Sequence, residues 1–162
     1  PPGTGDIPLT LAQTIPITGI LVITTPQDVA SNVAVKAVSM FEKLNVPIIG
    51  VIENMSHFIC PNCDEKHYIF GNGGAQKISE QFKIPFLGEI PLNYGIMSGS
   101  DLGKPIMITD VDSPSASAFR TSAKNVAAQC SIIASNLQEE MESEGSDTEP
   151  STDTSTSENT TS

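Results

Sequence analysis

The sequence predicts an α/β domain built on a mainly parallel sheet. Residues 19–25 and 46–54 form two continuous apolar runs rich in β-branched residues, which is typical of strands buried on both faces of such a sheet. The segment between the runs carries apolar residues at helical spacing, with Asp28 available as an N-cap. A strand, a helix and a strand in this order predict a right-handed βαβ unit. The expected apolar stripe of the helix consists of Val29, Val33, Ala37, Met40, Phe41 and Leu44.

The rest of the chain adds further elements by the same patterns. Residues 73–85 predict a short amphipathic helix through Ile78 and Phe82 that Pro85 ends. Residues 86–92 predict a third, shorter strand, and the glycine-rich stretch after it allows one or two helical turns. Residues 113–141 predict a long terminal helix that begins at Ser113 and Pro114. Its expected apolar stripe consists of Ala116, Phe119, Ala123, Val126, Ala127, Cys130, Ile133 and Leu137.

The net charge of −11 is concentrated at one end of the chain. From residue 139 onward there are eight acidic residues and no basic one, so the rest of the chain carries a net charge of −3. No basic patch occurs, and we therefore expect no nucleic-acid partner. No apolar run approaches the roughly 20 residues that span a bilayer, so we expect no membrane partner.

The end of the chain differs in composition from the rest. Twelve of residues 143–162 are Ser or Thr, and none is an apolar residue larger than proline. Because such a segment buries too little apolar surface to offset its ordering entropy, we expect a disordered acidic tail over 143–162 and one domain over 1–142. The tail is either a solubilising extension or a regulatory segment phosphorylated near Ser146 and Thr148.

Cysteine usage indicates a reducing compartment. The chain has three cysteines, two of them in a CxxC pair, which does not resemble the disulfide framework of a secreted protein. The start at Pro1 shows no signal-peptide pattern and reads as a truncated start. We therefore expect a cytoplasmic protein.

The opening stretch PPGTGD places a glycine-rich turn just before a short predicted helix. Free backbone N–H groups in such a turn can approach a phosphate closely, so the stretch is either a nucleotide-contacting loop or a tight connection between strand and helix. It is not a Walker A loop, because the pattern GxxxxGK[ST] occurs nowhere in the chain.

The CxxC pair is formed by Cys60 and Cys63, in a loop that also holds His57 and His67. Thiolate sulfur suits iron–sulfur clusters and zinc alike. A zinc site would add His67 and one further ligand, while a redox dithiol would need its CxxC at a helix N-terminus, and an inert loop would bind nothing. We expect both histidines to be solvated loop residues, and Cys130 to be a small hydrophobic residue of the core.

Seven motifs occur in a fixed order: PPGTGD, TTPQDVA, IENMS, CPNC, IFGNGG, LGEIPL and DLGKP. Together they resemble the C-terminal half of the Mrp/ApbC family, whose members are ATP-hydrolysing iron–sulfur cluster carriers related to MinD and ParA. The resemblance covers residues 1–137. It implies a partial P-loop NTPase fold of the SIMIBI/MinD-like type, with three layers and without the N-terminal half that carries the P-loop.

The resemblance also implies roles for particular residues. The loop before the first helix would sense the γ-phosphate and Mg²⁺, one asparagine would read the adenine, and the segment after the third strand would line the base pocket. The positions that match are Gly3, Thr4, Gly5 and Asp6 for the loop, Asn54 for the adenine, and Pro91 with Leu92 for the base pocket. Glu53 precedes the asparagine and receives no catalytic role.

For the cysteines, the resemblance implies a [4Fe-4S] cluster shared across a homodimer, with Cys60 and Cys63 from each subunit as ligands. The cluster would be passed to recipient apo iron–sulfur proteins. ATP and Mg²⁺ would be cofactors of the full-length protein, and whether this chain is itself an enzyme stays open because it lacks a Walker A loop. The leading alternatives are a MinD/ParA-like positioning ATPase, for which a basic amphipathic C-terminus is expected, and a zinc-stabilised structural module.

Overall fold

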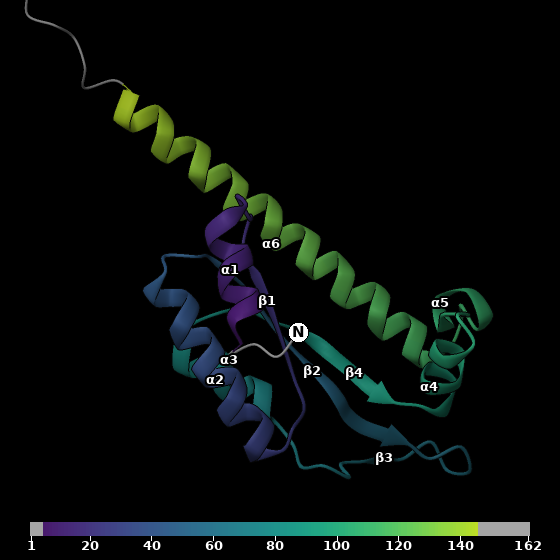
Figure 1. The fold of residues 1–162 in the computed structure, drawn as a ribbon. Helices are drawn as coiled ribbons and strands as arrows, with labels where there is room; N and C mark the ends of the chain where they lie inside the picture. Colours follow the sequence, from purple (N-terminus) through teal and green to yellow (C-terminus); the bar gives the residue numbers. More distant parts are fainter. Residues whose placement is uncertain (1–4, 146–162) are drawn as a thin grey trace, which may run out of the picture.

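A computed structural model describes residues 5–145, with side chains to residue 139, and shows a sheet between two helical layers (Figure 1). The elements are α1 (Asp6–Thr14), β1 (Ile20–Thr24), α2 (Asp28–Lys43), β2 (Ile48–Ile59), β3 (Lys66–His67), α3 (Gly74–Phe82), β4 (Phe86–Leu92), α4 (Tyr94–Asp101), α5 (Ile106–Thr109) and α6 (Pro114–Gly145). The predicted α/β class with a mainly parallel sheet is confirmed. Thr4 and Gly3 of the predicted phosphate loop, and residues 146–162 of the predicted tail, lie outside the described residues.

The sheet is built around β2. β1 and β4 both pair with β2 in parallel, and the short β3 pairs with the far end of β2 in antiparallel fashion. Phe58 pairs with a residue of β3 and with a residue of β4, so these two strands lie on opposite sides of β2. The carboxyl ends of three parallel strands therefore meet at one edge of the sheet, where ligands bind in open α/β folds.

One face of the sheet is covered by α2 and α3. The core on this side includes Val38, Val51 and Ile78, each no more than 2% exposed. The predicted apolar stripe of α2 is wrong at its beginning, because Val29 is 79% exposed and Val33 is 45% exposed. The helix is rotated so that its buried residues are Ala34, Ala37, Val38 and Phe41.

The other face is covered by α6, whose described side chains pack against the core of β2 and β4. Ser113 caps this helix as expected, since its Oγ accepts a hydrogen bond from the Ala116 N–H at 3.2 Å. The helix passes very close to β4 at Gly88, where an added Cβ would collide with the Ser122 side chain. Gly88 also has φ of +149°, so glycine is required there on both counts.

The contact side of α6 differs in part from the predicted stripe. Phe119, Val126 and Ile133 pack on the sheet, and Cys130 joins them half-buried, as expected of a core residue. Ala123, Ala127 and Leu137 of the predicted stripe are exposed instead. The helix runs to Gly145 and so continues past residue 143, at which the acidic tail is predicted to begin.

Candidate metal centre

The CxxC loop is the tip of a β-hairpin that the sequence did not predict. β2 continues past residue 54 to Ile59, and the chain then turns back into β3, with Ile59 opposite Lys66 and Phe58 opposite His67. The turn is closed by two backbone hydrogen bonds, from the Cys60 N–H to the Glu65 carbonyl oxygen at 3.0 Å and from the Asp64 N–H to the Cys60 carbonyl oxygen at 2.9 Å. The backbone of the loop is therefore fixed at its base.

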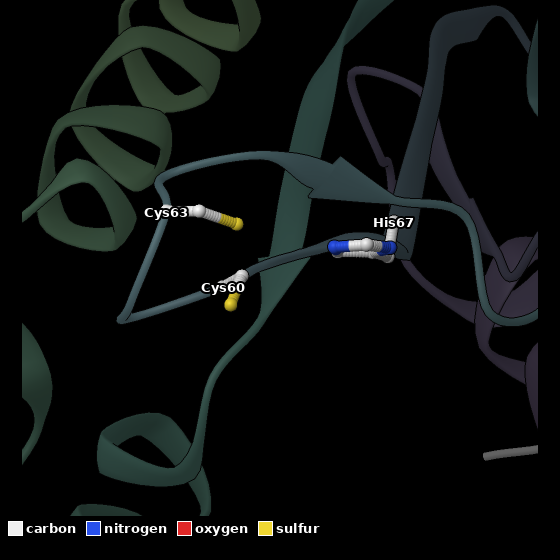
Figure 2. A group of neighbouring side chains, drawn as sticks. All are labelled: Cys60, Cys63 and His67. Atoms are coloured by element: carbon white, nitrogen blue, oxygen red, sulfur yellow. The ribbon is translucent and has the colours of Figure 1, made fainter.

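The hairpin brings together three side chains that bind transition metals (Figure 2). The Sγ atoms of Cys60 and Cys63 and a ring nitrogen of His67 all lie within 4.8 Å of one another. Both thiols are free, and Cys63 and His67 are exposed to solvent. Two soft sulfur donors and an imidazole at a surface suit zinc, iron and iron–sulfur clusters rather than Mg²⁺ or Ca²⁺.

The turn also favours the ionised form of Cys60. The backbone N–H of Asn62 lowers the pKa of the Cys60 thiol, and the backbone and side chain of Cys63 lower it further. These effects outweigh partial burial and the nearby charge of Asp64, which both raise the pKa. Because the thiolate is the form that binds metal, the loop prepares Cys60 as a ligand.

His57 is not the solvated loop residue that the sequence suggested. Its side chain is 6% exposed, and its Nδ1 lies 2.9 Å from Ser56 Oγ and 3.6 Å from Glu89 Oε2. Burial lowers the pKa of His57, with the charge of Lys66 acting in the same direction and those of Glu89 and Glu53 opposing it. We therefore read the contact with Glu89 as one made by a neutral imidazole, not as an ion pair.

His67 is exposed, as expected, yet it stands beside the two thiols. Its position follows from its pairing with Phe58 in the hairpin, which places its side chain close to the turn. The only sequence signal for this was the Cys-x₂-Cys-x₃-His spacing. Of the residues weighed for a metal site, the structure thus groups Cys60, Cys63 and His67, and it places His57 in the protein interior.

The residues expected near a nucleotide are less closely grouped. Asn54 lines a groove of about 700 Å³ along β1, together with Thr24 and Thr25, and its Oδ1 accepts a hydrogen bond from the Met55 N–H at 3.0 Å. Pro91 is buried and lines a different cavity of about 350 Å³, between β4 and α6. Leu92 is half-buried at the end of β4.

The glycine-rich loop is described only from its fifth residue. Gly5 is the N-cap residue of α1 and Asp6 is the exposed first residue of that helix. Neither residue is among those that line the groove beside Asn54 or the cavity beside Pro91.

Glu53 has a structural role that the sequence did not reveal. Its side chain is 1% exposed, and its Oε2 accepts a hydrogen bond from the Ala75 N–H at 2.8 Å. Ala75 lies in the first turn of α3, where N–H groups lack partners within the helix and a negative charge is stabilised. Glu53 therefore joins β2 to the start of α3, which receives the chain as it returns from the hairpin.

Comparison with known proteins places these features in a family. A family model of the ParA group, described as NUBPL iron-transfer P-loop NTPase, matches residues 1–127. The chain belongs to this family. The iron–sulfur cluster transfer protein NUBPL of Dictyostelium discoideum is 47% identical over 133 residues, which cover 82% of this chain and 41% of that protein. The iron–sulfur cluster carrier protein of Salmonella typhimurium is 49% identical over 129 residues, covering 80% of this chain and 35% of that protein.

Solved structures are similar to this member of the NUBPL iron-transfer family in fold. The nucleotide-binding protein of Archaeoglobus fulgidus, in complex with ADP and with cobalt found, is 39% identical with a TM-score of 0.59, and the match covers 70% of this chain and 45% of that one. The cell-division ATPase MinD of Pyrococcus furiosus, 22% identical with a TM-score of 0.51 over 67% of this chain and 41% of that one, shares the fold. The chain thus spans less than half the length of these relatives, and none of its described helices is long and apolar enough to cross a membrane.

Proposed function

We propose that this chain forms the cluster-holding part of an iron–sulfur cluster carrier. The observation that carries the proposal is the exposed hairpin tip, where the free thiols of Cys60 and Cys63 lie within 4.8 Å of each other. Relatives named as iron–sulfur cluster carrier and transfer proteins, at 47% and 49% identity, support it. The cluster is cargo in this proposal and leaves with the recipient.

A [4Fe-4S] cluster takes four thiolate ligands, and one hairpin offers two. A second copy of the chain, presenting the same hairpin tip, supplies the other two, so that a homodimer shares one cluster. Cys63 is exposed at the tip, which allows two hairpins to approach each other without rearrangement of the sheet.

Exposure also suits delivery of the cluster to an apoprotein. A cysteine thiolate of the recipient forms a bond to an iron, and the bond from that iron to Cys60 or Cys63 breaks. Repeating this exchange transfers the cluster without any change in oxidation state. A reducing compartment such as the cytoplasm keeps the donor and recipient thiols available for it.

ATP and Mg²⁺ belong to the whole protein in this proposal. Asn54, Thr24 and Thr25 lie at the edge where the parallel strands end, and a relative has been solved with ADP. Asn54 would contact the adenine there, with Pro91 further along the same edge, and the phosphate-binding loop would include Gly5 and Asp6. Hydrolysis of ATP would then change the relative position of the two subunits and with it the grip on the cluster.

Anaerobic reconstitution with iron and sulfide tests the proposal. We expect uptake of four iron and four sulfide ions per two chains, with the Mössbauer signature of a [4Fe-4S] centre. Cys60→Ala and Cys63→Ala should each abolish uptake, whereas Cys130→Ala should retain it because Cys130 packs on the sheet. Absence of cluster from the unaltered chain, or a cluster that persists in both hairpin variants, would overturn the proposal.

A further inference from the structure

We propose that one copy of the chain also binds a single divalent transition-metal ion, through Cys60 Sγ, Cys63 Sγ and a ring nitrogen of His67. The fourth coordination position stays open to solvent or to a partner's ligand. The inference rests on the proposed function in so far as it concerns the same two thiols. It adds His67 as a ligand, and it adds a metal-bound state that needs no second subunit.

The distances fit such a site with small adjustments. Bonds of about 2.3 Å to sulfur and 2.0 Å to nitrogen at tetrahedral angles place ligand atoms roughly 3.5–3.8 Å apart. The three ligand atoms lie within 4.8 Å of one another with no ion between them. Because Cys63 and His67 are exposed, rotation of their side chains can close the remaining distance without disturbing the core.

Backbone pairing in the hairpin holds Cys60 and His67 in place, and Cys63 lies in the turn between them. His67 is opposite Phe58 in the β2–β3 ladder, and Cys60 is tied to the other strand by the hydrogen bond from its N–H to Glu65. The site therefore requires no contribution from a second chain to bring its donors together. Three protein ligands with one open position form the arrangement found in zinc sites that exchange a ligand.

The donor set also decides which ions fit. Two thiolates neutralise the charge of a divalent ion, and a neutral imidazole adds none, so the occupied site carries no net charge. Sulfur and imidazole donors favour Zn²⁺, Fe²⁺ and Co²⁺ over Mg²⁺ and Ca²⁺, which prefer oxygen. While such an ion is bound, both thiolates are occupied, and cluster uptake has to wait until the ion leaves.

Titration of the metal-free chain with Co²⁺ under anaerobic conditions tests the inference. We expect one Co²⁺ per chain, with thiolate-to-cobalt charge-transfer bands and the intense visible bands of a tetrahedral ion, and no change in the sedimentation of the chain when the ion is added. Zn²⁺ should displace the cobalt. His67→Ala should weaken binding by more than the roughly 10–100-fold loss that follows removal of an outer-shell partner.

Two further variants test whether a loss of affinity in His67→Ala comes from the missing ligand atom. Lys66→Ala changes the other residue of β3 and should leave the Co²⁺ affinity unchanged. His67→Cys should restore tight binding with an added charge-transfer band, because a third thiolate replaces the imidazole. Unaltered affinity in His67→Ala, or a stoichiometry of one ion per two chains, would overturn the inference; thermal unfolding of each variant checks that it is folded.

Cluster reconstitution of His67→Ala separates this inference from the proposed function. We expect this variant to take up the [4Fe-4S] cluster, because four thiolates suffice for it. If the unaltered chain binds single ions through His67 but takes up no cluster, the proposed function fails and the inference stands. If the cluster forms but single-ion binding does not depend on His67, the inference fails and the proposed function stands.

Discussion

His57 shows how a single buried residue makes the stability of the fold depend on pH. Burial lowers its pKa from the ordinary value of 6.5, so the folded chain binds a proton less readily than the unfolded chain. Its contribution to the free energy of unfolding is therefore complete above pH 6.5 and is lost as the pH falls through the lowered pKa.

We expect urea unfolding between about pH 7.5 and about pH 5.5 to show this loss. In His57→Gln the part of the pH dependence that comes from this imidazole should disappear, leaving a flatter profile. His67→Gln serves as the matched control, because His67 is the other histidine of the chain and its side chain is exposed. Equal slopes in the unaltered chain and His57→Gln would contradict the assignment.

For single residues, the sequence predicted the properties that follow from residue type and missed those that follow from burial. Cys60 and Cys63 could be singled out because two thiols with two residues between them are typical metal ligands whatever fold surrounds them. The burial of His57 could not be foreseen, since it depends on how β4 lies against β2. Met55, with φ of +55°, interrupts the pairing of these strands between Asn54 and Phe58, and a bulge of this kind redirects the side chains that follow.

Among the elements, the junction of β2 and α3 depends on Glu53. Removing its carboxylate in Glu53→Ala leaves the buried Ala75 N–H without a partner, so we expect a loss of about 1–3 kcal/mol in the free energy of unfolding. Glu53→Gln keeps an acceptor oxygen in the same place and should lose less. Urea unfolding at neutral pH measures both.

The exposed Glu42 on α2 provides the control, because Glu42→Ala should change the free energy of unfolding little. Equal destabilisation by Glu53→Ala and Glu53→Gln would show that the hydrogen bond to Ala75 is not what the carboxylate contributes. A loss in Glu42→Ala as large as that in Glu53→Ala would point to charge alone.

The strands and helices with a strong pattern of apolar residues were predictable. An element that forms only by pairing with a neighbouring strand was not. β1 and α2 follow from apolar runs and spacing, although the rotation of α2 is decided by which of its faces meets the sheet. β3 has two residues, both exposed, and its sequence carries no apolar alternation. It exists because the turn after Ile59 directs the chain back along β2.

At the scale of the whole molecule, β1 borders an open groove that is lined mainly by apolar residues. Within the described residues β1 pairs with β2 alone, and the groove beside it is lined by residues such as Ile23, 60% exposed, and Val33, 45% exposed. We expect the chain on its own to self-associate through this edge in metal-free buffer and to bind a hydrophobic dye.

Ile23→Lys should reduce both effects, because a charge on an edge strand opposes pairing with another chain. Ile132→Lys is the matched control, since Ile132 is 50% exposed on α6 and does not line the groove. Sedimentation velocity over a range of concentrations, with dye fluorescence alongside, measures the outcome. A reduction as large in Ile132→Lys as in Ile23→Lys would place the association elsewhere.

The three-layer arrangement was predictable because the ordered motifs resemble a family whose fold is known. The relative placement of the expected nucleotide contacts was not. Asn54 lies in β2 and Pro91 in the neighbouring parallel strand β4, yet they line different cavities, since the bulge at Met55 and the approach of α6 decide which way each faces. Such details depend on contacts between segments that are distant in the sequence.

One continuous strand links the two ends of the proposed mechanism. Asn54 lies within β2 and Cys60 directly follows its last residue, so the two are separated by at most about 20 Å of backbone, with the bulge at Met55 between them. On a rod of that length, a rotation of about 5° at one end moves the other by nearly 2 Å. In the proposed mechanism, β2 would therefore convey a slight twist at the nucleotide edge to Cys60 as a displacement of that size.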